Sequence, residues 1–179
     1  MNENNTTQPD FNARFKEKIE ELKDTIIPLG KDPGTSCAAL TLTHILDVLD
    51  REDLRSHYFN NLAIPFSGLA SYTSKNNWKG ACGAVGGAMA AIGVIMGGHE
   101  EAKSNDVPKI YAKAVRFASK FENQFGSLSC EDICGVNTSQ NIREYVKNRV
   151  WENKCVNFVL FAVEQVGNLT KKDLDEKWK

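Results

Sequence analysis

The segment that most constrains the fold is residues 81–98, which carry no charged side chain and are mostly glycine and alanine. Each glycine inside a helix costs about 1 kcal/mol relative to alanine, so several in one helix need a compensating gain. Close approach of a neighbouring helix supplies one, because small residues let two helix axes come nearer than leucine would. We predict a closely packed central helix from about Ala81 to Met96, which ends at Gly97 and Gly98.

The same segment is about long enough to span a bilayer. Glycine and alanine contribute almost nothing to the free energy of insertion, and only six residues of the segment are strongly apolar. The summed insertion energy is therefore marginal. We expect a helix buried in a soluble core, with no membrane insertion.

Apolar residues recur at helical spacing along most of the rest of the chain. We expect a loop from Pro65 to Asn77, and no segment shows the period of two that a strand requires. The sequence predicts an all-α fold, a single-domain bundle of about six to seven helices around the Gly/Ala-rich helix. The domain should cover residues 11–169, between a disordered lead-in at residues 1–10 and a charged C-terminal tail at residues 170–179. The other expected helical segments are Phe11 to Ile27, Cys37 to Leu49, Arg51 to Leu62, Val107 to Phe125, a short turn with Cys130, Ile142 to Val150, and Val156 to Val166.

Composition narrows the class of function. The 179 residues are 41% hydrophobic and 25% charged, with a formal net charge of −1. That balance suits one globular domain and offers no basic excess for nucleic acid. The polar first ten residues have no apolar signal region, so we expect a cytoplasmic location. Structural disulfides are rare in a reducing compartment, where cysteines more often serve metal or redox chemistry.

Five cysteines are spread along the chain. Cys37, Cys82 and Cys130 fall near predicted helix N-termini, and Cys155 begins the last predicted helix. The helix dipole at such positions favours the thiolate and lowers the thiol pKa. Cys134 follows Cys130 by about one helical turn, so the two thiols could share a face. There is no Cys-x-x-Cys, which argues against a zinc ribbon and against covalent haem. Inert core thiols remain an alternative, since free cysteine is often buried.

The order of these cysteine contexts resembles a redox-active family named for its C_GCAxxG_C_C pattern. The resemblance covers nearly the whole chain between the lead-in and the tail. The matching segments are Ser36-Cys37-Ala38, Cys82-Gly83-Ala84-Val85-Gly86-Gly87, Phe125-Gly126-Ser127-Leu128-Ser129-Cys130 and Lys154-Cys155-Val156.

Three features depart from the family pattern. The family's Gly-Cys-Ala is here Ala81-Cys82-Gly83, with the small residues exchanged around the thiol. The glycine-rich loop that often precedes this motif is here Ile64 to Leu69, with one glycine. Cys134 is an extra cysteine, nearer to Cys130 than the additional cysteine often seen in the family, and no role follows for it.

The resemblance implies a helical fold. Related domains in split-Soret cytochromes are associated with an iron–sulfur centre, which implies electron transfer through a [2Fe–2S] cluster. In that hypothesis Cys37, Cys82, Cys130 and Cys155 are the metal ligands, and backbone N–H groups near Gly83 and Ala84 bond to the sulfurs.

Other functions stay open. One alternative is metal-free thiol–disulfide chemistry with Cys82 as the attacking thiol, and another is a structural zinc site. The related cytochromes dimerise, so a homodimer is expected, and the redox partner protein is unknown.

Overall fold

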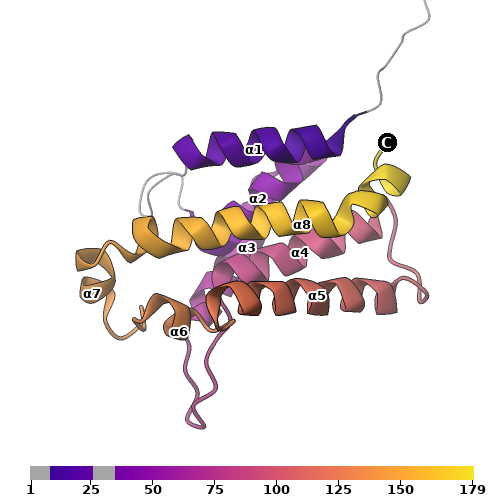
Figure 1. Cartoon of the computed structure of the whole chain (residues 1–179). Helices are drawn as coiled ribbons and strands as arrows, with labels where there is room; N and C mark the ends of the chain where they lie inside the picture. Colours follow the sequence, from indigo (N-terminus) through magenta and orange to yellow (C-terminus); the bar gives the residue numbers. More distant parts are fainter. Residues whose placement is uncertain (1–8, 26–34) are drawn as a thin grey trace, which may run out of the picture.

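The computed structural model describes residues 9–25 and 35–179, and these residues form an all-α bundle, as predicted (Figure 1). They contain eight α-helices and no strand, only two isolated bridges. Residues 1–8 of the expected lead-in lie outside the described residues. The elements are α1 Phe11–Thr25, α2 Cys37–Val48, the 3₁₀ turn η1 Glu52–Arg55, α3 His57–Ala70, α4 Gly83–Gly97, α5 Val107–Phe125, α6 Cys130–Cys134, α7 Ile142–Lys147, the π-turn η2 Trp151–Cys155 and α8 Val156–Lys177.

The Gly/Ala-rich helix α4 is central, with α2, α3, α5 and α8 packed around it. Glycine allows the closest of these approaches. A Cβ at Gly87 would lie 2.3 Å from the carbonyl oxygen of Ala38 and 2.9 Å from Cβ of Thr41, both on α2. Gly93, by contrast, has open space beside it. Close packing of α2 on α4 therefore offsets the low helix propensity of glycine at particular positions, such as Gly87, and not along the whole helix.

Helix α8 forms the second axis of the bundle, with α1 packed on one side of it and α5 on another (Figure 1). A Cβ at Gly167 would lie 2.7 Å from the Phe15 ring of α1. On the α5 side, Phe121 and Phe125 make edge-to-face contacts with Phe161, with ring centroids 5.9 and 5.1 Å apart. Such contacts add to the stabilisation that area burial gives.

Two predicted boundaries are wrong. Helix α3 continues through Pro65 to Ala70, where the sequence predicted a loop from Pro65. Proline leaves the carbonyl of Asn61 without its helical donor, but both residues are exposed, so water can replace that donor.

The expected tail is also a helix. Helix α8 runs to Lys177 instead of ending near Val166. Thr170 and Leu174 are buried, and the Trp178 indole N–H donates to the carbonyl of Ile95 at 2.8 Å. The charged residues of 170–179 lie on the outer face of a helix that packs on the core, because the apolar residues between them keep a helical period.

Among the helices that the structure describes, none combines the length and the apolar character that a membrane crossing requires.

Candidate cysteine site

All five thiols gather at the end of the bundle where α6, α7 and the start of α8 meet. Two sulfur–sulfur contacts join three of them. Cys134 Sγ lies 3.9 Å from Cys130 Sγ and 3.8 Å from Cys155 Sγ. Cys37 lines the same cavity as Cys130 and Cys155, and Cys82 is close enough to influence the others electrostatically. Four segments far apart in the sequence thus supply one cluster.

A short antiparallel bridge sets Cys82 beside Cys130. The Cys82 N–H donates to the carbonyl of Leu128 at 2.7 Å, and the Cys130 N–H donates to that of Gly80 at 3.1 Å. Glycine is required at position 80, because a Cβ there would lie only 1.9 Å from the carbonyl oxygen of Leu69. The segment just before α4 is therefore fixed between the end of α3 and the start of α6.

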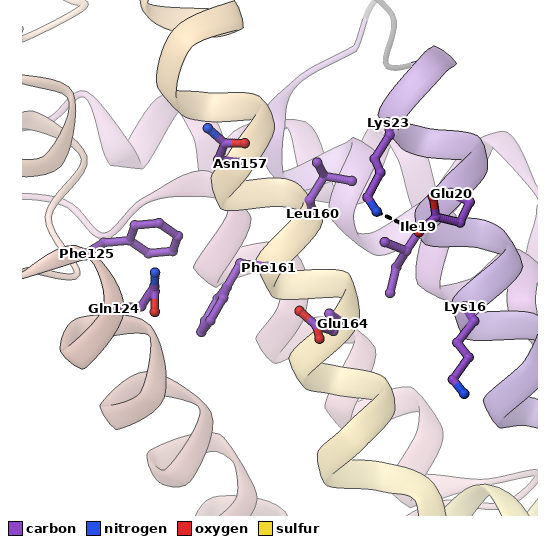
Figure 2. Close-up of a pocket in the computed structure, with 10 residues that line it drawn as sticks. All are labelled: Lys16, Ile19, Glu20, Lys23, Gln124, Phe125, Asn157, Leu160, Phe161 and Glu164. Carbon is purple, nitrogen blue, oxygen red and sulfur yellow. Dashed lines mark hydrogen bonds and ion pairs between the residues drawn. The ribbon is translucent and has the colours of Figure 1, made fainter.

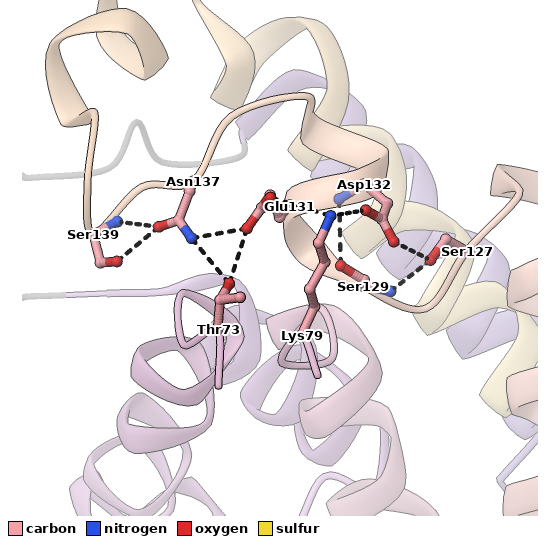
Figure 3. Close-up of polar contacts among 8 residues, drawn as sticks. All are labelled: Thr73, Lys79, Ser127, Ser129, Glu131, Asp132, Asn137 and Ser139. Carbon is pink, nitrogen blue, oxygen red and sulfur yellow. Dashed lines mark hydrogen bonds and ion pairs between the residues drawn. The ribbon is translucent and has the colours of Figure 1, made fainter. Parts of the chain in front are cut away.

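Polar contacts hold α6 against the hairpin of residues 72–80, as Figure 3 shows. Lys79 Nζ lies 3.1 Å from Glu131 Oε1 and 2.5 Å from Asp132 Oδ1. The other Glu131 oxygen accepts from Thr73 at 2.9 Å and from Asn137 at 2.8 Å. Because α6 has only one turn and few buried side chains, these contacts position its two cysteines.

Cys155 has the most hydrogen-bonding partners of the described thiols. Cys134 and Cys37 bond to its sulfur, and together with the Tyr145 hydroxyl at 3.3 Å they lower the pKa of Cys155 to about 4. Lys154 adds a favourable charge. The sequence placed Cys155 at a helix N-terminus, but the π-turn before it is continuous with α8. Hydrogen bonds, rather than a free helix end, therefore favour its thiolate.

The pKa prediction is wrong for Cys37 and Cys82. The pKa of Cys37 is raised by hydrogen bonding with Cys155 and by burial. Burial raises the pKa of Cys82 to about 12, and the facing N–H groups of Ala84 and Val85 oppose that rise only in part. Desolvation and neighbouring thiols outweigh the helix dipole at both positions. Cys130 keeps the predicted direction, since a hydrogen bond from Cys134 lowers its pKa.

A cavity of about 210 Å³ opens onto three of the cysteines, Cys37, Cys130 and Cys155. Its remaining lining includes Tyr145, and it also includes Gly83, one of the two residues predicted to bind a cofactor. A larger hollow of about 560 Å³ lies between α1, α5 and α8 (Figure 2), and no cysteine lines it. Lys23 there donates to Glu20 at 2.6 Å. Of these two hollows, only the smaller one is lined by cysteines.

Gly83 and Ser67 share one small space beside Cys37. A Cβ at Gly83 would lie 2.5 Å from Ser67 Oγ and 3.1 Å from Cys37 Cβ. Ser67 Oγ accepts a hydrogen bond from the Ala38 N–H at 3.1 Å, at the start of α2. The serine hydroxyl thus occupies the space that a methyl group at position 83 would need.

We expect Gly83→Ala to destabilise the protein by about 1–3 kcal/mol, as overpacking does. Ser67→Ala alone should cost about 1 kcal/mol, because the Ala38 N–H loses its partner. In the double variant the clash with Oγ disappears. Its loss of unfolding free energy should therefore be smaller than the sum of the two single-variant losses, by at least about 0.5 kcal/mol. Urea unfolding of all four proteins measures this coupling, and strictly additive losses would show that the two residues do not share the space.

The chemistry of the donors suits a thiophilic metal centre. Zinc and iron–sulfur clusters are held by thiolates, and this end of the bundle offers five. When two thiolate sulfurs bind one tetrahedral metal with metal–sulfur distances of about 2.3 Å, the sulfurs lie about 3.8 Å apart. The Cys130–Cys134 and Cys134–Cys155 sulfur distances are close to this value. Among the described residues, no group of three or more His, Cys, Asp or Glu side chains is arranged so that it could hold a metal ion. Binding would therefore require the assembled thiols to turn toward a common centre.

Sequence reasoning missed two polar partners of the cluster, Tyr145 and Ser67. Neither stands at a diagnostic spacing from a cysteine, and only the fold brings Tyr145 to Cys155. The Cys130-x-x-x-Cys134 spacing did indicate a shared face, and the 3.9 Å contact confirms it. Ala84 lies where it was expected, with its N–H toward the Cys82 sulfur.

Comparison with known proteins gives one match. The model of the family described as "Putative redox-active protein (C_GCAxxG_C_C)" matches residues 35–169. No curated protein and no solved structure matches the chain. The matched range begins just before Cys37, ends after Cys155, and so contains every cysteine of the cluster.

Proposed function

Since this chain belongs to the C_GCAxxG_C_C family, we propose that its cysteine cluster is a redox centre that holds an iron–sulfur cluster of the [2Fe–2S] type. The observation that carries the proposal is the clustering of thiols at one end of the bundle: Cys37, Cys130 and Cys155 open onto one small cavity, and the Cys134 sulfur contacts those of Cys130 and Cys155. When bound, such a cluster accepts and donates single electrons.

The residues around the thiols have definable roles in this proposal. The Tyr145 hydroxyl donates toward Cys155 Sγ at 3.3 Å, and hydrogen bonds to ligating sulfurs raise the potential of an iron–sulfur centre. Gly83 keeps side-chain bulk out of the cavity wall. The Lys154 ammonium favours negative charge at Cys155. Buried walls around the sulfurs limit access of water.

Reconstitution tests the proposal. Reduced protein incubated with Fe²⁺ and sulfide without oxygen should develop visible charge-transfer absorption that stays with the protein through gel filtration. Folding and metal binding should be coupled, because the thiols come from segments far apart in the sequence. A colourless product whose five thiols remain fully reactive would contradict it, and a colourless product with bound zinc would favour the structural zinc alternative.

A second candidate, metal-free thiol–disulfide chemistry, is favoured by one observation. Cys134 and Cys155 are 3.8 Å apart, and Cys155 is the thiol whose pKa is lowered. The Cys155 thiolate would attack a low-molecular-weight disulfide and release one thiolate from it. Cys134 would then lose its proton and displace the second one, leaving a Cys134–Cys155 disulfide. In this candidate Cys155, rather than the buried Cys82, is the attacking thiol.

The cysteine content also bears on location and assembly. Free thiols persist in a reducing compartment, so we propose the cytoplasm. For the assembly we propose a homodimer in which α3 meets its own copy. The redox partner is left open.

Helix α3 exposes its apolar side chains, the reverse of an ordinary surface helix. It has no Asp, Glu, Lys or Arg, and it buries only Ala63 and Ala70. The exposed apolar side chains of α3 and the following hairpin offer on the order of 700 Å², close to the ~800 Å² per partner of a stable interface. An uncharged face provides nothing for a charged partner and suits a second copy of itself. These side chains are Tyr58, Leu62, Ile64, Phe66, Leu69, Tyr72 and Trp78.

We expect the native chain to sediment as a dimer and the Leu62→Glu variant as a monomer. Leu62 is 61% exposed, so the glutamate harms the interface and not the core. Val115→Glu is the matched control, because Val115 is 68% exposed on α5, away from α3, and its variant should stay dimeric. Analytical ultracentrifugation with circular dichroism measures both, and a monomeric native chain would rule out the α3 interface.

A further inference from the structure

The sequence resemblance assigned Cys130, and not Cys134, to the four-cysteine pattern, yet the Cys134 sulfur contacts two other sulfurs of the cluster. It is 3% exposed and is the last residue of α6. Its sulfur is 3.9 Å from that of Cys130 and 3.8 Å from that of Cys155. The two other cysteines are thus linked through Cys134.

These two distances are those of ligands on one metal. Sulfurs bound at about 2.3 Å to a tetrahedral metal are about 3.8 Å apart. Cys82 lacks such a contact. In the described part of the chain the Cys82 sulfur contacts no other sulfur, and Cys82 does not line the cavity that Cys37, Cys130 and Cys155 share. Sulfur contacts therefore join Cys130, Cys134 and Cys155, and Cys37 faces the same cavity as Cys130 and Cys155, which makes four thiols without Cys82.

The backbone fixes Cys134 in this position. Lys154 Nζ donates to the carbonyls of Cys134 at 2.9 Å and Ile133 at 3.2 Å. Gly135, with φ of 76°, ends α6 in the left-handed region that glycine adopts readily. Because Lys154 is adjacent to Cys155, one side chain couples the end of α6 to the turn that carries Cys155. Its positive charge also offsets the negative charge of gathered thiolates.

Cys82 instead contributes to the packing at the start of α4. It precedes the first turn of α4, is 2% exposed, and its N–H is bonded to Leu128. Neighbouring Gly83, and not Cys82, contributes to the lining of the cavity.

We propose that Cys134 is a metal ligand in place of Cys82, so that the ligand set is Cys37, Cys130, Cys134 and Cys155. This proposal rests on the metal-binding function proposed above. Cys82 then serves the packing at the start of α4.

Two matched serine variants test the ligand set, Cys134→Ser and Cys82→Ser. Each is reconstituted without oxygen with Fe²⁺ and sulfide, and iron, sulfide and the visible spectrum are measured per chain. Cys134→Ser should lower the iron affinity at least about tenfold, or shift the charge-transfer bands where its oxygen replaces sulfur. Cys82→Ser should keep the native iron content and spectrum. Loss of iron from Cys82→Ser, or an unchanged Cys134→Ser, would overturn the proposal.

Differential alkylation of the native chain gives the same answer without any variant. Cys134 should react more slowly in the metal-loaded than in the metal-free protein, while Cys82 should react equally in both. Protection of Cys82 with no change at Cys134 would overturn the proposal. If the native chain takes up no iron, the function proposed above fails, and Co²⁺ titration of the same three proteins decides the ligand set. Cobalt–thiolate absorption should then be lost in Cys134→Ser alone, and its loss in Cys82→Ser would overturn the set.

Discussion

Replacing Cys155 with serine is expected to remove nearly all the iron that the reconstituted protein binds. Cys155 Sγ lies 3.8 Å from Cys134 Sγ and 3.3 Å from the Tyr145 hydroxyl, and Cys155 lines one cavity with Cys37 and Cys130. Loss of partners outside the ligand sphere already costs about 10–100-fold in metal affinity, so loss of a central ligand should cost at least that much. Iron per chain and the visible spectrum after gel filtration measure the effect.

The serine variant should still fold, because its side chain is nearly as large and its hydroxyl can bond to Tyr145. Ile142→Ala is the matched control. Ile142 lines the same cavity and is 57% exposed, but it supplies no sulfur, so this variant should bind iron like the native chain. A Cys155→Ser protein with native iron content and an unchanged spectrum would exclude Cys155 from the ligand set.

Gly87→Ala is expected to destabilise the fold by about 2 kcal/mol, which lowers the melting temperature by about 4–8 °C. The new methyl would lie 2.3 Å from the Ala38 carbonyl oxygen, a backbone atom that cannot turn away. Helix α2 would have to move, and since α2 begins with Cys37, iron uptake should fall as well. The gain in helix propensity is only about 1 kcal/mol and does not offset the clash.

Gly93→Ala is the control on the same helix. Nothing lies within 4 Å of a Cβ at Gly93, so the alanine should stabilise the protein by up to about 1 kcal/mol. Thermal unfolding followed by circular dichroism compares the two variants with the native chain. Equal effects of the two substitutions would show that α2 does not pack on α4 as closely as described.

The sequence predicted the all-α class and the central position of α4 because both depend on local pattern. Uncharged small residues over 81–98 leave few alternatives to a closely packed helix. The end of α3 was missed because Pro65 usually stops a helix, whereas here the affected carbonyl faces water. The length of α8 was missed because Thr170, a polar residue, is buried against the core and Leu174 continues the apolar face.

For the site, sequence indicated which residues carry the chemistry but not how they are arranged. Helix N-termini suggested low thiol pKa values, and that reasoning held in direction for Cys130 and failed for Cys37 and Cys82. Burial and sulfur–sulfur contacts decide those values, and both depend on segments far apart in the chain. The partnership of Cys155 with Tyr145, and that of Gly83 with Ser67, likewise exist only once the helices have packed.

The most direct test of the central proposal is the iron and acid-labile sulfide content of the chain purified without oxygen. The account predicts two irons and two sulfides per chain, together with visible charge-transfer absorption. Protein that contains only zinc, or that contains no metal and has five freely titratable thiols, would contradict it.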